Sequence, residues 1–187
     1  IVVANDGDAD RYGVLDEYGN YVSPNVVLAM LLKYLSKKGT KGKMIKTVGV
    51  SNLVSVVAKK LNIETITTPV GFKWLSEKMR ENQTILAGED SGGLSIGEHI
   101  PEKDGLLANL LIIEMLSSKK KTLNKLTEEL KNFIGYFFCC RPCIRRDEFY
   151  SLVFFWIVRS SKHYCTDRIR IEFCIVCNNR RWNDFRR

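Results

Sequence analysis

The chain has 187 residues, of which 45% are hydrophobic and 27% are charged. This composition is typical of a globular protein that buries a sizeable core, and it excludes both a disordered chain and a small disulfide-stapled domain. The longest apolar run in the C-terminal part, residues 152–158, is too short to cross a bilayer. We therefore expect no membrane-spanning segment.

The formal net charge of +8 is unevenly distributed. In residues 1–137 the positive and negative charges are nearly balanced, whereas residues 138–187 carry most of the positive excess. Ten of the eleven basic residues in this tail are Arg, and the tail also contains all six Cys. Because the excess charge does not belong to the body of the chain, it predicts no nucleic-acid partner. The chain opens at Ile1 without an initiator Met or a signal-like segment, so we expect a fragment of a longer, cytoplasmic protein.

Strand patterns alternate with helix patterns along residues 1–136. A short strand and a loop precede a hairpin-like segment, and Ser23 and Gly39 mark the two ends of the first helix. The expected elements are a strand at 1–4, a hairpin at 12–22, helices at 24–38, 53–61, 72–79, 106–116 and 123–133, and strands at 44–50, 63–67 and 84–87. This order predicts a three-layer α/β/α domain with a mostly parallel sheet, preceded by a strand-loop-hairpin piece.

The strongest local signal is the acidic segment Asn5-Asp6-Gly7-Asp8-Ala9-Asp10-Arg11. In an extended loop, alternate residues point to the same side, so the three carboxylates would repel each other unless a cation joined them. Carboxylate oxygens suit Mg²⁺. A solvated acidic turn is the simpler alternative. An EF-hand loop is rejected because Arg11 stands where that loop requires Gly.

Three further loops follow predicted strands or precede predicted helices. Gly88-Glu89-Asp90-Ser91-Gly92-Gly93 combines small residues with polar groups that suit a polyhydroxyl ligand, unless it is only a flexible turn. Pro69-Val70-Gly71-Phe72-Lys73-Trp74 places Lys73 near a helix N-terminus, with Phe72 and Trp74 expected in the core. His99-Ile100-Pro101-Glu102-Lys103-Asp104-Gly105 would bring His99 and Lys103 toward a ligand, or form a solvated charged loop. We expect the loops 88–93 and 69–73 to meet at one edge of the sheet.

These four segments, in this order, resemble the α-D-phosphohexomutase family, which includes phosphoglucomutase and phosphomannomutase. The resemblance covers about residues 1–136. It implies that residues 1–22 end the second domain of such an enzyme and residues 23–136 form its third. The implied reaction interconverts hexose 1-phosphate and hexose 6-phosphate through a phosphoserine and a bisphosphate intermediate.

The resemblance also implies roles for particular residues. Asp6, Asp8 and Asp10 would bind Mg²⁺, and Arg11 would lie beside the transferring phosphoryl group as the catalytic residue. Lys73, Glu89 and Ser91 would bind the hexose phosphate substrate. From the position of their loop, we expect His99 and Lys103 to bind it as well. The family's Ser-His-Asn-like loop and its Ser-Gly-Thr phosphate loop do not occur in this sequence. We therefore expect the isolated chain to be inactive without the missing domains of the same enzyme.

Residues 137–187 do not follow the family pattern. Two Cys-x-x-Cys pairs, Cys140 with Cys143 and Cys174 with Cys177, have zinc-ligand spacing. However, Gly and Ala disappear from this tail and Lys gives way to Arg. This change favours translation in a shifted reading frame, so we expect the tail to have no folded role.

Two alternatives from other classes remain. A haloacid-dehalogenase-like phosphatase also places Asp-x-Asp after an apolar strand, here Asp6 and Asp8, with Ser51 and Lys73 as later partners, although Asp10 does not fit its pattern. The other alternative is a non-catalytic fragment that binds a sugar phosphate or has only a structural role.

Overall fold

The computed structural model describes residues 1–135. The predictions for residues 137–187, including the zinc ligands and the shifted reading frame, lie outside the described residues. Within the described part the strands form a two-stranded sheet and a four-stranded sheet. None of the helices between residues 1 and 135 combines the length and the apolarity that a membrane span requires.

The four-stranded sheet has the order β4-β3-β5-β6. β3 (Lys43–Thr47) lies between β4 (Thr65–Thr68) and β5 (Thr84–Gly88) and pairs parallel with both, as predicted. β6 (Leu94–Ile96) pairs antiparallel with β5. The sequence did not predict β6, because three residues after a Gly-rich loop are too few to display an alternating pattern.

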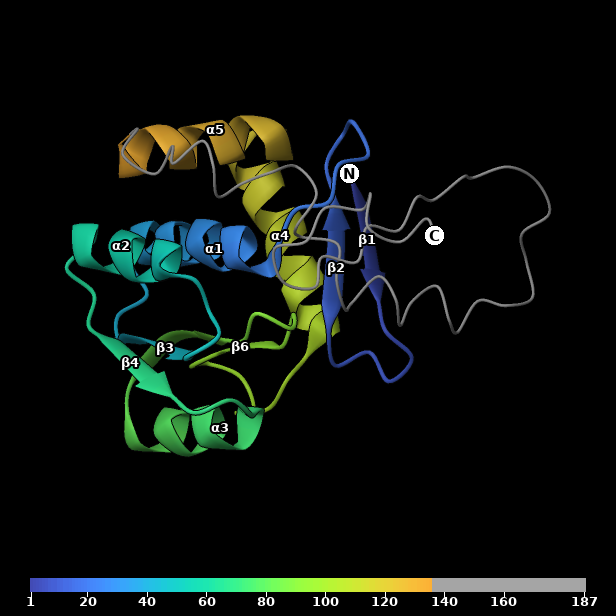
Figure 1. Cartoon of the computed structure of the whole chain (residues 1–187). Helices are drawn as coiled ribbons and strands as arrows, with labels where there is room; N and C mark the ends of the chain where they lie inside the picture. The colour runs from blue at the N-terminus through green and yellow to red at the C-terminus, as the bar shows by residue number, and fades with distance from the viewer. Residues whose placement is uncertain (136–187) are drawn as a thin grey trace, which may run out of the picture. The chain divides into compact units, whose positions relative to one another are not determined.

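Helices cover both faces of this sheet, which confirms the three-layer α/β/α prediction (Figure 1). α1 (Pro24–Lys38) packs on β5 from one side, and α3 (Phe72–Glu81) packs on β3 and β5 from the other. α2 (Asn52–Lys60) lies beside α1, and α5 (Leu123–Ile134) packs against both α1 and α2. The sheet is thus buried between apolar helix faces, as a largely parallel sheet requires.

The strand β3 shows why the sheet needs cover on both faces. Its neighbouring residues Met44 and Ile45 are both fully buried but belong to two different apolar clusters. Met44 faces the cluster that contains α1, whereas Ile45 faces Phe72 and Leu75 of α3. Successive side chains of a strand point to opposite faces, so a run of apolar residues indicates a strand buried on both sides.

The ends of α1 follow from local chemistry. Pro24 occupies the first turn, where its missing N–H is not needed. Gly39 ends the helix at φ 102°, and its N–H bonds the carbonyl oxygens of Leu35 and Ser36. Ser23 is the N-cap residue, as predicted, but its hydroxyl makes no capping hydrogen bond.

The N-terminal piece differs from the prediction in one respect. β1 (Val2–Asn5) and β2 (Tyr12–Leu15) themselves form the antiparallel pair, and the acidic loop connects them. The expected hairpin at 12–22 is reduced to a turn and a single bridge between Leu15 and Tyr21. The Asp16 carboxylate accepts backbone N–H bonds within this turn, so the turn is satisfied locally and extends no strand pairing.

The N-terminal pair is attached to the larger sheet through α4 (Gly105–Lys119). This helix contacts β1 and β2 as well as β6 and α1. In Figure 1 it runs from the four-stranded sheet past the two N-terminal strands. α4 therefore connects the acidic loop to the loop between β5 and β6.

Candidate functional site

The acidic loop between β1 and β2 gathers its three carboxylates. One oxygen of each of Asp6, Asp8 and Asp10 lies within 4.8 Å of the others. The loop is a tight turn rather than the extended segment that we expected: the Ala9 N–H bonds the Asp6 carbonyl at 3.1 Å, and Ala9 has φ 58°. The convergence was predicted, but a turn produces it.

Two cations lie against this acidic cluster. The Arg11 Nε atom is 3.6 Å from Asp10 Oδ1 and 3.9 Å from Asp6 Oδ2. The Lys103 Nζ atom lies 2.9 Å from Asp10 Oδ2, and this hydrogen bond raises the pKa of Lys103. Lys103, one of the residues expected to bind substrate, thus contacts the acidic loop in this structure.

Residues that the sequence analysis did not single out hold the loop in place. The side-chain amide of Asn5 donates to the Arg11 carbonyl at 2.8 Å, and that of Asn109 donates to Asn5 Oδ1 at 2.9 Å. The Gly105 N–H bonds the Ala9 carbonyl at 3.0 Å. Asn109 carried a usable signal, because a buried amide inside an otherwise apolar stretch of helix needs a specific partner.

Glu89 is the central side chain of the second loop. Its side chain is 7% exposed, and its Oε1 atom accepts the Gly71 N–H at 3.1 Å. This bond confirms that the loops 88–93 and 69–73 meet at one edge of the sheet. The anion beside the N-terminus of α3 is therefore the Glu89 carboxylate itself, which the partial positive charge of the helix end favours.

Other residues of these loops have more open positions. Ser91 is half-buried in a turn. The Glu89 N–H closes this turn by donating to the Gly93 carbonyl at 2.9 Å. Lys73 is exposed, with its Nζ atom 4.7 Å from the centre of the Trp74 ring. Trp74 itself is 39% exposed, so the expectation that it lies in the core was wrong, whereas Phe72 is buried.

The two loops are joined directly through their backbones. Arg11 and Gly93 form an antiparallel bridge, and the Tyr12 N–H bonds the Gly92 carbonyl at 3.3 Å. A Cβ atom on Gly93 would lie 2.9 Å from Lys103 Cδ and 3.3 Å from Glu89 Oε2. The acidic cluster, Lys103 and Glu89 therefore belong to one site, although their loops are about eighty residues apart in the sequence.

The third loop closes this site at the start of α4. Asp104 caps the helix by accepting the Leu107 N–H at 2.8 Å, and its other oxygen lies 2.9 Å from His99 Nε2. The Leu107 hydrogen bond, assisted by His99, lowers the pKa of Asp104. The ionised Asp104 carboxylate therefore stabilises the fold at pH values above its pKa in the unfolded chain. This contribution is lost as the pH falls through its pKa in the folded chain. His99, one of the residues expected to bind substrate, contacts the capping residue Asp104 in this structure.

The phosphatase alternative requires Ser51 and Lys73 to join Asp6 and Asp8. In the structure the Ser51 hydroxyl caps α2 by accepting the Leu53 N–H, and Lys73 lies over Trp74. The strand before Asp6 also belongs to the separate two-stranded sheet rather than to the parallel one. The geometry thus favours a site built from Glu89 and Lys103 with the acidic cluster.

Comparison with known proteins identifies the relatives of this chain. Residues 23–133 match the family model described as phosphoglucomutase/phosphomannomutase, alpha/beta/alpha domain III. A phosphoglucosamine mutase from Halalkalibacterium halodurans is 37% identical over 135 residues, which are 71% of this chain and 30% of that protein. A Thermus thermophilus protein solved under the name phosphomannomutase is 38% identical with a TM-score of 0.69, over 71% of this chain and 30% of its own.

A more distant structure shares the fold. It is the Aspergillus fumigatus N-acetylphosphoglucosamine mutase in complex with GlcNAc-6P and magnesium, with 16% identity and a TM-score of 0.53 over 70% of this chain and 34% of its own. The chain belongs to the phosphoglucomutase/phosphomannomutase family. It spans about 30% of the length of the Halalkalibacterium halodurans relative.

Proposed function

We propose that this chain supplies the metal loop and the sugar loop of a phosphohexomutase. The parent enzyme would transfer a phosphoryl group between the 1- and 6-positions of a hexose, through a phosphoserine and a bisphosphorylated sugar. The observation that carries this proposal is the backbone pairing of Arg11 with Gly93, which brings the acidic cluster and Glu89 into one site.

The acidic cluster fits a divalent cation by its donor set. Asp6, Asp8 and Asp10 would hold Mg²⁺, which prefers carboxylate oxygens and supplies charge neutralisation at a transferring phosphoryl group. Arg11, half-exposed beside Asp6 and Asp10, can hold the same phosphoryl group by its guanidinium without leaving the loop. Its role would be electrostatic stabilisation rather than proton transfer.

The sugar would lie over Glu89 and Ser91. A buried carboxylate accepts hydrogen bonds from two hydroxyls, and the Ser91 hydroxyl can donate or accept. This set tolerates a sugar in either of two orientations, as transfer between two ends of one molecule requires. Lys73, His99 and Lys103 would complete the substrate contacts, with Lys103 moving between Asp10 and the substrate.

The remaining groups would come from other parts of the same enzyme. The sequence contains neither the Ser-His-Asn-like loop nor the Ser-Gly-Thr loop, and the chain spans about 30% of its curated relative. We also propose that residues 1–22 end one domain of this enzyme, that residues 23–136 form the next domain, and that the enzyme is cytoplasmic. The isolated chain would hold part of a site and have no mutase activity.

We further propose a hexosamine phosphate as the substrate, since curated relatives such as the Halalkalibacterium halodurans protein are phosphoglucosamine mutases. The test is a chimera in which residues 1–135 replace the matching segment of the Halalkalibacterium enzyme. We expect the chimera to turn over glucosamine phosphate with a higher kcat/KM than mannose or glucose phosphate. Coupled assays with each sugar phosphate would measure kcat/KM.

The host enzyme and an Asp8→Asn version of the chimera serve as controls. A folded chimera without turnover of any hexose phosphate would contradict the mutase proposal. Turnover with the preference shifted to mannose phosphate would contradict only the choice of hexosamine.

Metal binding by the chain alone should be weak. Lys103 already pairs with Asp10, and Mg²⁺ usually completes its octahedron with water and phosphate oxygens that this chain does not supply. Titration with Mn²⁺, followed by water-proton relaxation, should give weak binding that Asp8→Asn reduces by about tenfold or more. Lys103→Met should tighten it by freeing Asp10.

Asp90→Asn is the matched control. Its exposed carboxylate lies against Gly49, outside the acidic cluster, so the affinity should not change. Tight binding that none of Asp6→Asn, Asp8→Asn and Asp10→Asn weakens would rule out the acidic cluster as the metal site.

A further inference from the structure

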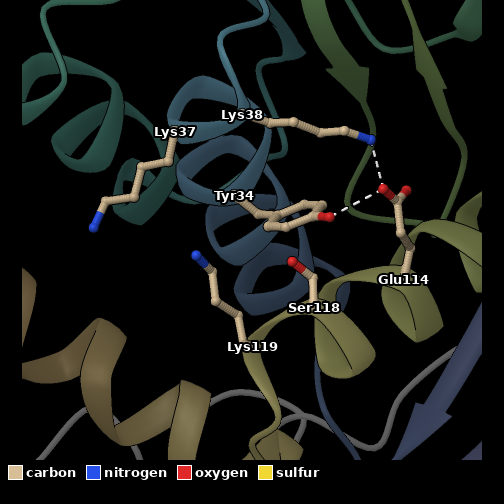
Figure 2. A pocket seen from close by; sticks show the side chains of 6 residues that line it. All are labelled: Tyr34, Lys37, Lys38, Glu114, Ser118 and Lys119. Atoms are coloured by element: carbon tan, nitrogen blue, oxygen red, sulfur yellow. Dashed lines mark hydrogen bonds and ion pairs between the residues drawn. The ribbon is translucent and has the colours of Figure 1, made fainter.

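A pocket lined by polar side chains lies between the C-terminal ends of α1 and α4, with a volume of about 310 Å³. Figure 2 shows side chains from the two helices facing each other across it, with the Tyr34 ring between them. Its lining residues are Tyr34, Lys37, Lys38, Glu114, Ser118 and Lys119. Three of these six side chains thus carry an ammonium group, and one carries a carboxylate.

The carboxylate is already compensated. Glu114 Oε1 accepts the Tyr34 hydroxyl at 3.0 Å and forms an ion pair with Lys38 Nζ at 2.5 Å (Figure 2). The hydrogen bond from Lys38 lowers the pKa of Glu114, and the same contact raises the pKa of Lys38. These two charges neutralise each other, so the charge of the pocket is set by the other two lysines.

Lys37 and Lys119 leave a positive excess. Within residues 1–135 neither forms an ion pair with a carboxylate, and Lys119 Nζ lies 5.8 Å from the centre of the Tyr34 ring. Lys33, one helical turn before Lys37, is affected by the same excess. Burial lowers its pKa and the charge of Lys37 lowers it further; the Glu129 carboxylate opposes this shift, and the charges of Lys119 and Lys121 add to it.

The lysines of the pocket lie at the C-terminal ends of two helices. This position accounts for each lysine separately, but not for the number of lysines around one pocket. A lysine in the last turn interacts favourably with the free carbonyls of its own helix. α1 ends with Lys37 and Lys38 and α4 with Lys119, and the two helices pack together. Glu114 pairs with Lys38 and nearby Glu129 pairs with Lys121, so Lys37 and Lys119 remain as a positive excess within the described residues.

The pocket is separate from the site described above. The acidic loop contacts the first residue of α4, Gly105, whereas the pocket is lined by Glu114, Ser118 and Lys119 near its last turn. At about 1.5 Å per residue, these two parts of the helix are roughly 15–20 Å apart. A ligand in the pocket would leave the acidic cluster free.

We propose that this pocket binds a phosphate group, with Lys37, Lys119 and Ser118 as its binding residues. A phosphate offers several acceptor oxygens and about two negative charges, which match two ammonium groups and one hydroxyl donor. The basic groups line a pocket rather than an extended stripe, which favours a compact anion over a nucleic acid. The phosphate can be free or carried by a metabolite.

The test follows the backbone amide signals of Lys37, Ser118 and Lys119 in ¹⁵N-labelled full chain by NMR. Inorganic phosphate and glucosamine 6-phosphate are titrated separately, with chloride keeping the ionic strength constant. We expect saturable shifts at these three amides, and an affinity about tenfold or more lower in Lys119→Gln, since this variant removes a charged hydrogen-bond donor. Equal affinities identify the phosphate group alone as the ligand, and tighter binding of the sugar phosphate identifies a metabolite.

Two variants control for charge and for the other site. Lys125→Gln removes an exposed lysine of α5 outside the pocket, and Arg11→Gln removes the guanidinium of the acidic loop. Neither should change the shifts in the pocket. Shifts that do not saturate, or that Lys119→Gln and Lys125→Gln weaken equally, would overturn the proposal.

Discussion

Replacing Gly105 by Ala should destabilise the fold by about 1–3 kcal/mol, the usual cost of overpacking a tight site. A Cβ atom there would lie 2.4 Å from the Arg11 carbonyl oxygen and 2.4 Å from the Asn5 side-chain nitrogen. The obstacle includes backbone, so α4 or the acidic loop must shift. Urea unfolding should show the loss, and Mn²⁺ binding should weaken with it.

Gly13→Ala is the matched control for this change. Gly13 lies in β2 of the same N-terminal pair, and a Cβ atom there would meet nothing within 4 Å. Its stability should remain the same or rise slightly. If both variants unfold at the same urea concentration, the close approach of α4 to the acidic loop does not limit stability.

Glu89→Gln in the chimeric enzyme should lower kcat/KM by about 10- to 100-fold. The amide keeps the size of the side chain and an oxygen that can accept the Gly71 N–H, so the two loops should still meet. What it loses is the negative charge, and hydrogen bonds to charged groups contribute about 1.5–3 kcal/mol. Kinetics with glucosamine phosphate would measure the effect, and circular dichroism would verify the fold.

Glu77→Gln provides the comparison, because Glu77 is exposed on α3 and has the same charge. It should leave kcat/KM unchanged. A Glu89→Gln chimera as active as the Glu77→Gln chimera would show that the Glu89 carboxylate does not contact the sugar.

Much of the fold follows from local patterns in the sequence. The helix α1 has apolar residues at helical spacing between Pro24 and Gly39, and the parallel strands have short apolar runs that are typical of strands buried on both faces. These signals need no knowledge of distant residues. The boundaries of these elements moved by one to three residues. The strand β3, for example, ends at Thr47, whose carbonyl accepts the Val50 N–H in a turn.

The site was only partly predictable, because its decisive contacts are not local. The three carboxylates are neighbours in the sequence, so their convergence could be expected. The ion pair of Lys103 with Asp10 and the bridge of Arg11 with Gly93 join segments more than eighty residues apart. No pattern in either segment specifies its partner, and the three-residue strand β6 that carries Gly93 into place is too short to be recognised.

The attachment of β1 and β2 to α4 has a consequence for the order of folding. The Asn109 amide bonds Asn5 and the Ala4 carbonyl across more than a hundred residues of chain. Closing so long a loop costs entropy before any contact compensates it, so contacts of this kind form late. On a ribosome, β1 would emerge about a hundred residues before Asn109, so the acidic loop would wait for α4 before it takes shape. The cation-binding geometry should therefore appear among the last features of the folding chain, after the parallel sheet and its helices.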